Sequence, residues 1–160
     1  MKKGVVAYQD EALAEVAEMF FANVEPRTFG WHLLDSSKLD FSIESLKHVD
    51  AYLLLIRDDP KVKEDWNRTV MRCGAYVGEV VRRATSSGQF RWVDYETAAA
   101  INFQVRGFGY VVGTAAVLYK APISIVFPLA KVEKCLEYGE QDNTHFFAQV
   151  IAAQAKEGSL

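Results

Sequence analysis

The most suggestive polar residues of this chain stand together where Glu79 is followed by Arg82 and Arg83. On a helix, either arginine lies one turn from Glu79 and can pair with its carboxylate. If Glu79 faces the strand expected next in the chain, it would meet Trp92 or Tyr95 and become a candidate for acid–base chemistry. A structural ion pair or a solvated helix face would account for the same residues without any chemistry. The candidate polar site comprises Glu79, Arg82, Asp94 and Tyr95.

The familiar catalytic and metal-binding patterns are missing from the sequence. The histidines, His32, His48 and His145, are too scattered for a local metal motif. There is no G-x-S-x-G elbow and no Walker A loop. Glycines within residues 107–113 are spaced G-x-G-x-x-x-G, but they precede an expected strand, whereas a dinucleotide loop follows one. The sequence therefore predicts no metal, no cofactor and no assignable catalytic residue.

A second group of residues favours binding over catalysis. Residues 102–112 read NFQVRGFGYVV and place aromatic and arginine side chains around two glycines in an expected loop. Tyr, Trp and Arg are favoured anchors at protein interfaces. Buried packing is the other common use of such residues, so their exposure would mark a partner-binding surface. The candidate interface comprises Phe103, Arg106, Phe108 and Tyr110.

The elements that must position these residues are helical in the first half of the chain. Apolar residues recur there at helical spacing, and Asp59 followed by Pro60 is typical of a helix start. Asp10 and Ser42 offer caps for the two earlier helices. We expect helices over about 10–25, 42–57 and 61–86, the last of which stops at Gly88.

Two glycines, Gly74 and Gly78, lie one turn apart on the third of these helices. Each costs about 1 kcal/mol of helix stability relative to alanine. Small residues four apart let two backbones approach closely. We therefore expect another element to cross the helix closely at this point.

The second half of the chain begins with a change to a period of two, which predicts strands. A short turn around Pro122 joins the last two strands into a hairpin. The signals in residues 96–109 disagree. The alanines at 98–100 favour a helix, whereas Arg106-Gly107-Phe108-Gly109 favours a loop. The strands are expected over 89–95, 110–119 and 123–127.

Two further helices close the chain. Pro128 starts the first, Gly139 ends it, and residues 142–144 offer caps for the second. The pattern predicts an α+β fold in a single globular domain of residues 1–160. Its parts are a mainly helical half (1–88), a small antiparallel sheet (89–127) and two C-terminal helices (128–156).

Several of these motifs together resemble a family of uncharacterised bacterial proteins. They are Leu39-Asp40-x-Ser42-x-Glu44-Ser45-Leu46, Asp50-x-Tyr52-Leu53, Gly74-Ala75-Tyr76-Val77-Gly78-Glu79-Val80, Trp92, Gly113-Thr114-Ala115-Ala116-Val117-Leu118, Phe127-Pro128-Leu129-Ala130-Lys131-Val132 and Phe146-Phe147-Ala148-Gln149. The resemblance covers about residues 39–151. It implies a bacterial domain of unknown function and carries over no activity and no catalytic residue.

Composition and charge narrow the function classes. The net charge of −3 over 160 residues argues against a nucleic-acid binder, whose domain usually carries a basic surplus. The apolar stretch 97–130 is broken by polar residues and glycines, which argues against a membrane span. Cys73 and Cys135 have no CxxC spacing and are expected to be reduced core thiols, and the N-terminus does not resemble a signal peptide. We therefore expect a cytoplasmic protein.

These observations favour a non-catalytic module that binds a protein partner, and an antitoxin-like or immunity protein is one concrete version. The alternative from a different class is a small-ligand-binding protein or enzyme with a pocket around Glu79 and Arg82, between the third helix and the sheet. A homo-oligomer whose interface is the apolar segment 97–127 is a third possibility.

Overall fold

Helix α3 (Trp66–Ala84) is the element against which most of the structure packs, with α1, α6 and α7 on its sides. The computed structural model describes residues 6–85, 89–158 and 160, which form an α+β fold of seven α-helices and a three-stranded antiparallel sheet. The other helices are α1 (Asp10–Met19), α2 (Leu46–Ile56), α4 (Tyr95–Ile101), α5 (Gln104–Phe108), α6 (Pro128–Tyr138) and α7 (Thr144–Lys156). The strands are β1 (Arg91–Asp94), β2 (Ala116–Lys120) and β3 (Ser124–Val126), in the order β1-β2-β3.

The two glycines of α3 lie where other elements approach the helix most closely. A Cβ atom added at Gly74 would lie 2.7 Å from Cγ and 2.8 Å from Cα of Leu129 in α6. A Cβ at Gly78 would overlap the six-membered ring of the Trp92 indole and lie 3.2 Å from Cγ of Pro128. The predicted close crossing is confirmed, and it joins α3 to both the sheet and α6.

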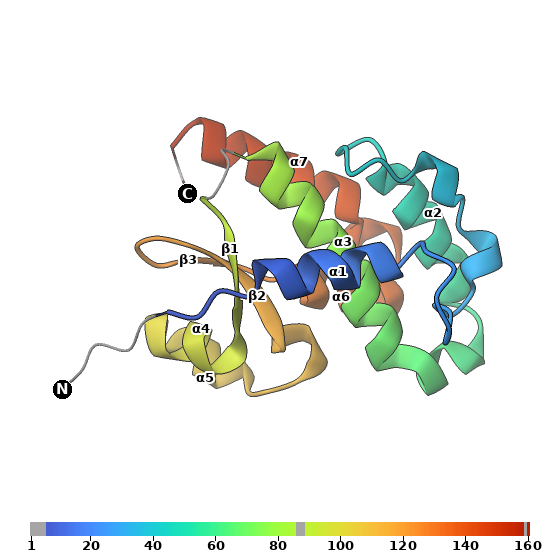
Figure 1. The fold of residues 1–160 in the computed structure, drawn as a ribbon, viewed down its shortest axis with the longest axis horizontal. Helices are drawn as coiled ribbons and strands as arrows, with labels where there is room; N and C mark the ends of the chain where they lie inside the picture. The colour runs from blue at the N-terminus through green and yellow to red at the C-terminus, as the bar shows by residue number, and fades with distance from the viewer. Residues whose placement is uncertain (1–5, 86–88, 159) are drawn as a thin grey trace.

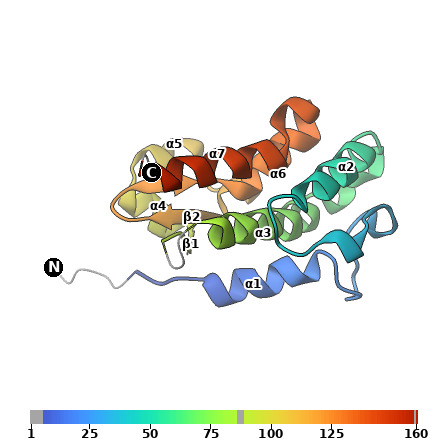
Figure 2. The same ribbon diagram turned by 90° about the horizontal axis from the view of Figure 1, so that it is seen from above.

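The sheet is buried on both faces because helices cover each of them. Trp92 and Leu118 point into the main core, which they share with the helices around α3. Val93 and Val117 point the other way, into a second apolar cluster with residues of α4 and α5. Figure 1 and Figure 2 both place α4 and α5 side by side at the end of the molecule opposite α2.

The segment between β1 and β2 differs from what the sequence indicated. The loop favoured around Arg106 is wrong, because α5 includes this residue and follows directly after α4. The strand expected from Tyr110 begins only at Ala116, and a 3-10 turn at Val112–Thr114 precedes it. The hydroxyl of Thr114 accepts a hydrogen bond from the Val111 amide at 3.0 Å and donates one to the Gly109 carbonyl at 2.8 Å. These local bonds satisfy backbone groups that a strand would have paired across the sheet.

Several helix ends follow their local signals and others do not. The carboxylate of Asp59 accepts the Lys61 amide at 2.9 Å, but Pro60–Asp65 form a 3-10 turn and the α-helix starts at Trp66. Pro128 and Gly139 bound α6 as predicted. Asp10 does not cap α1, because its carboxylate instead binds β1. The expected stop of α3 at residues 86–88 lies outside the described residues.

The N-terminus of α7 is held by a side chain from a distant helix. The Asp50 carboxylate of α2 accepts hydrogen bonds from the amide and hydroxyl of Thr144, at 2.7 and 2.6 Å, and from the His145 amide at 3.0 Å. A carboxylate at a helix N-terminus satisfies unpaired amides and complements the helix dipole. No helix in the described part of the chain has the length and apolarity needed to cross a membrane.

Candidate functional site

Glu79 is buried, and one oxygen of its carboxylate is bound by two neighbouring side chains. Its Oε2 atom accepts hydrogen bonds from Nη1 of Arg82 at 2.9 Å and from Nε1 of Trp92 at 3.1 Å. Arg82 also donates from Nε to the Phe90 carbonyl at 3.0 Å. Arg83 does not join this group, because its guanidinium stacks over the Phe41 ring at 3.7 Å.

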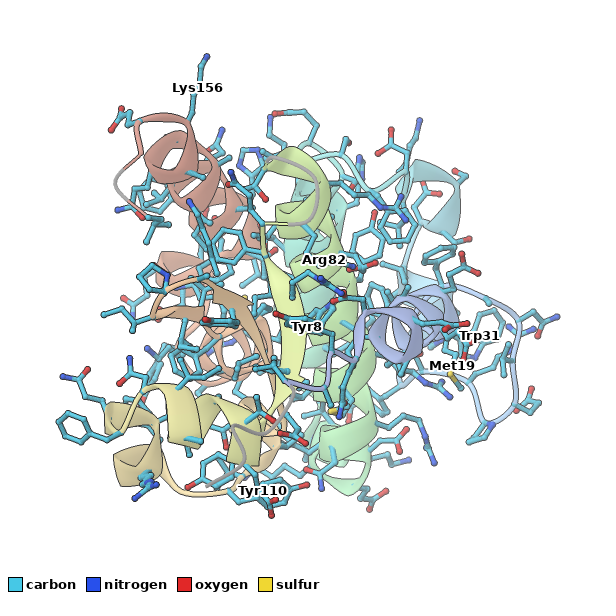
Figure 3. All side chains as sticks on the ribbon, turned by 60° about the vertical axis from the view of Figure 1, so that its left-hand side comes forward. Tyr8, Met19, Trp31, Arg82, Tyr110 and Lys156 are labelled. Atoms are coloured by element: carbon cyan, nitrogen blue, oxygen red, sulfur yellow. The ribbon has the colours of Figure 1, made fainter. Side chains whose placement is uncertain are left out.

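The same cluster extends to the start of α1. One oxygen of the Asp10 carboxylate accepts the Trp92 amide at 2.7 Å, and the other pairs with Nε of Arg91 and lies 3.5 Å from Nη2 of Arg82. Figure 3 shows Arg82 near Tyr8, where α3, β1 and the segment before α1 meet. Neither Glu79 nor Arg82 lines a cavity that the structure describes. The arrangement ties together three elements: α3, β1 and α1.

Asp94 and Tyr95 have different surroundings. The Asp94 carboxylate accepts the Thr97 amide at 2.8 Å and so caps α4. The Tyr95 ring meets the Tyr110 ring edge to face, with 5.7 Å between the ring centroids. Within the described residues, no hydrogen bond or ion pair joins either of them to Glu79 or Arg82. The structure thus divides the candidate polar site into two separate places.

The candidate interface residues all lie on the outside of the molecule. Phe103, Phe108 and Tyr110 keep 77%, 61% and 71% of their surface exposed, and Arg106 is also exposed. Val105 is the buried residue of α5 and anchors this short helix on the second apolar cluster. Because Val105 points inward, the residues around it on α5 face solvent. We call Phe103, Arg106, Phe108 and Tyr110 the aromatic surface.

An apolar cavity of about 540 Å³ borders the aromatic surface, and we call it the apolar groove. Phe108 belongs to both, and its ring also meets the Phe127 ring edge to face at 5.6 Å. A space of this size is typical of binding pockets in proteins. Its walls come from α5 and the following loop, the end of β3, α6 and α7, and include Phe108, Val111, Val126, Phe127, Lys134 and Phe147.

The charged side chains that line the groove differ in their hydrogen-bond and ion-pair partners. Glu133 accepts a hydrogen bond from Nε1 of Trp66 at 2.8 Å, and Lys131 pairs with Asp142 at 3.0 Å. Lys134 is exposed and takes part in no ion pair among residues 6–85, 89–158 and 160. Glu133 keeps its negative charge, because the Trp66 indole that donates to it is neutral, so the lining of the groove presents one side chain of each sign, Glu133 and Lys134.

The histidine, cysteine and acidic side chains were checked for groups that could hold a metal ion, and the cysteines for reactive thiols. Among the described residues, no group of three or more His, Cys, Asp and Glu side chains could hold a metal ion. Cys73 and Cys135 are both buried free thiols. Burial raises the pKa of Cys135 to about 12 and that of Cys73 well above its ordinary value. Both thiols are therefore protonated and unreactive at neutral pH.

The sequence pointed to one edge of this site and missed the rest. The spacing of aromatic residues in 102–112 identified the aromatic surface. Phe127, Lys134 and Phe147 were not connected to it, because they come from elements up to 40 residues away and show no shared local motif. No family model, curated protein or solved structure matches this chain. The resemblance of residues 39–151 to a bacterial family stays a prediction.

Proposed function

We propose that this protein binds a protein partner through the aromatic surface and carries out no catalysis of its own. The observation that carries the proposal is the exposure of Phe103, Phe108 and Tyr110 together with Arg106 in a stretch of eight residues. Single exposed apolar side chains are ordinary on protein surfaces, whereas three exposed rings in one short segment beside a cavity favour an interaction site.

The free energy available at such a surface is substantial. Removing apolar area from water is worth about 25 cal/mol per Å², which amounts to about 2 kcal/mol for one aromatic ring. Tyr and Arg are also among the residues that dominate binding energy at protein interfaces. Phe108 lies on α5, which Val105 anchors, and Phe103 directly precedes this helix, so the backbone at these two rings loses little freedom when a partner covers them.

The acidic chain suggested an antitoxin-like or immunity protein that covers the basic surface of a toxin. Exposed side chains of both signs lie near the aromatic surface: Arg106 belongs to it, and Glu96 follows Tyr95, whose ring meets that of Tyr110. The local charge therefore does not select between this version and another protein partner.

The alternative of a small-ligand pocket around Glu79 and Arg82 has no observation in its favour. The Oε2 atom of Glu79 already accepts hydrogen bonds from Arg82 and Trp92, and neither Glu79 nor Arg82 is among the residues that line the apolar groove. The proposal includes a homo-oligomer, in which the partner is a second copy of this chain.

The test is affinity capture from native cells with the tagged chain, followed by quantitative mass spectrometry. We expect a protein recovered at about one copy per chain with the wild type, and at least tenfold less of it with Phe103→Ala/Tyr110→Ala. The matched control is Tyr138→Ala/Phe146→Ala, which removes two other exposed rings of the same types, from α6 and α7. Equal recovery by all three proteins would overturn the proposal. Sedimentation of the same proteins identifies a partner that is a second copy.

A further inference from the structure

We propose that a second cavity, just after the end of α1, binds a small aromatic carboxylate. The cavity has a volume of about 240 Å³ and lies between residues 20–23 and residues 27–36. The second of these segments packs on α2, since a Cβ added at Gly30 would lie 2.6 Å from Cγ2 of Ile56. Figure 1 and Figure 2 place α2 at the end of the molecule opposite α4 and α5. The cavity is therefore separate from the aromatic surface, and binding there is independent of the proposed function.

The walls of this cavity combine aromatic rings with hydrogen-bond donors. Three residues supply the rings: Phe20, Phe21 and Trp31. Four residues supply groups that can donate to an anion: Asn23, Arg27, His32 and Ser36. No aspartate or glutamate is among the described residues that line the cavity. Apolar walls with a few convergent polar groups are the usual composition of a small-molecule site.

Arg27 supplies the permanent positive charge of the lining, and part of its guanidinium is available to a ligand. The guanidinium stacks over the Trp31 ring, 3.7 Å from its centroid, and Nη2 donates to Oδ1 of Asn23. Its Nη1 atom has no hydrogen-bond partner among residues 6–85, 89–158 and 160. A guanidinium carries five N–H donors and can bind a carboxylate through two of them, so Arg27 can hold a ligand in addition to these contacts.

Glu25 is the carboxylate that competes for Arg27. One of its oxygens lies 3.5 Å from Nε of Arg27, and its side chain is 81% exposed. Exposed ion pairs of this kind are weak and are screened by salt. Because Glu25 does not line the cavity, it reduces the attraction of the site for an anion without filling the site.

The segment that carries Arg27 is held in place by buried side chains of other helices. The guanidinium of Arg72 in α3 donates to the Pro26 carbonyl at 2.7 Å, and the hydroxyl of Tyr52 in α2 donates to the Phe29 carbonyl. Both side chains are buried. A ligand therefore meets a site that is already formed, and little conformational entropy is lost in ordering the segment.

The combination of groups and the size of the cavity select the class of ligand. A carboxylate matches the planar fork of a guanidinium, and Ser36 offers a hydroxyl donor on the same lining. Inorganic phosphate would leave the rings of Phe20 and Phe21 without a contact, and a neutral ring would leave Arg27 without one. The volume is about that of eight water molecules, which suits a single ring with one small substituent.

The experiment compares benzoate with benzamide, which has the same ring and nearly the same shape but no charge. Both are titrated at low salt into the ¹⁵N-labelled full chain, and NMR correlation spectra report the Kd. We expect benzoate to bind at least about tenfold more tightly than benzamide. The indole N–H resonance of Trp31, assigned with Trp31→Phe, should shift. Those of Trp66 and Trp92 should not, because their indoles donate to Glu133 and Glu79 away from this cavity.

Three variants locate the binding. Arg27→Gln should weaken benzoate at least about tenfold, to the Kd of benzamide. Lys156→Gln makes the same change of net charge at the end of α7, far from Trp31 in Figure 3, and should leave the Kd unchanged within about twofold. Glu25→Gln removes the competing carboxylate and should strengthen benzoate about threefold. The spectra show directly whether each variant is folded, and Glu25→Gln tests the site even if Arg27→Gln does not fold.

Four results would overturn the proposal. They are equal Kd values for benzoate and benzamide, no shift of the Trp31 resonance at millimolar benzoate, equal effects of Arg27→Gln and Lys156→Gln, and weaker benzoate binding in Glu25→Gln. Inorganic phosphate that binds as tightly as benzoate would overturn the aromatic class of the ligand. Capture of a protein partner through Phe103 and Tyr110 is measured separately, so each of the two proposals can fail while the other stands.

Discussion

Replacing Gly78 by alanine tests the crossing on which the whole arrangement depends. The added Cβ would overlap the Trp92 indole, whose side chain is completely buried. The indole cannot turn away freely, because its Nε1 donates to the buried Glu79 carboxylate at 3.1 Å. Pro128, with Cγ 3.2 Å from the added atom, limits movement on the other side.

The expected magnitude follows from opposing contributions. Overpacking a filled core costs about 1–3 kcal/mol. Weakening the Trp92–Glu79 hydrogen bond costs about another 1 kcal/mol. The higher helix propensity of alanine returns about 1 kcal/mol. We therefore expect Gly78→Ala to lower the free energy of unfolding by about 1–3 kcal/mol, and Gly78→Leu to prevent folding.

Urea unfolding followed by circular dichroism measures this difference, and Gly107→Ala is the matched control. Gly107 lies in α5, and an added Cβ there would have no heavy atom within 4 Å. The same substitution should therefore stabilise the protein at this position, by about 0.4–1 kcal/mol. The opposite signs separate steric overlap from helix propensity.

A double-mutant cycle with Trp92→Phe identifies the clashing group. Phenylalanine lacks the six-membered ring of the indole that the Gly78 Cβ would meet. Gly78→Ala should therefore cost at least about 1 kcal/mol less in the Trp92→Phe background than in the wild type. A Gly78→Ala protein as stable as the wild type, or a cycle without coupling, would refute the reasoning.

Two further predictions concern buried polar groups. Asp50→Asn should lower the free energy of unfolding by about 2–3 kcal/mol, because the amide cannot accept all three hydrogen bonds from the start of α7. The exposed Asp58→Asn should change it by less than about 0.5 kcal/mol in the same urea titrations, and equal effects would contradict the role of Asp50. Cys73 and Cys135 should not react with Ellman's reagent at pH 8 in the native protein and should both react in urea. Since burial raises both thiol pKa values, their contribution to stability is complete below the ordinary thiol pKa and decreases as the pH rises toward about 12 for Cys135. Rapid labelling of the native protein would contradict the burial of these thiols.

Several features could be predicted from the sequence because their signals are local. A proline at the first turn and a glycine after the last one bound α6, since each acts on its own backbone conformation. The turn around Pro122 joins β2 and β3 for the same reason. The spacing of Gly74 and Gly78 predicted a close crossing. It did not identify Leu129 and Trp92 as the residues that contact the helix there.

Other features were decided only when distant segments met. Thr114 lies in a segment whose residue types favour a strand. Its hydrogen bonds to Gly109 and Val111 hold this segment in a turn instead, and β2 starts only at Ala116. Glu79 and Arg82 looked like a site that could do chemistry, and the structure places them in a buried ion pair between α3, α1 and β1.

By itself, the sequence determined the α+β class, the bounds of α6 and the presence of a group of aromatic residues in one short segment, since these depend on neighbours within one or two turns. Only the tertiary structure decided that Phe103, Phe108 and Tyr110 are exposed and that a groove lies beside them. The physical reason is that exposure depends on which other elements cover a residue. Here β3, α6 and α7 fold next to Phe108 and stop short of covering it.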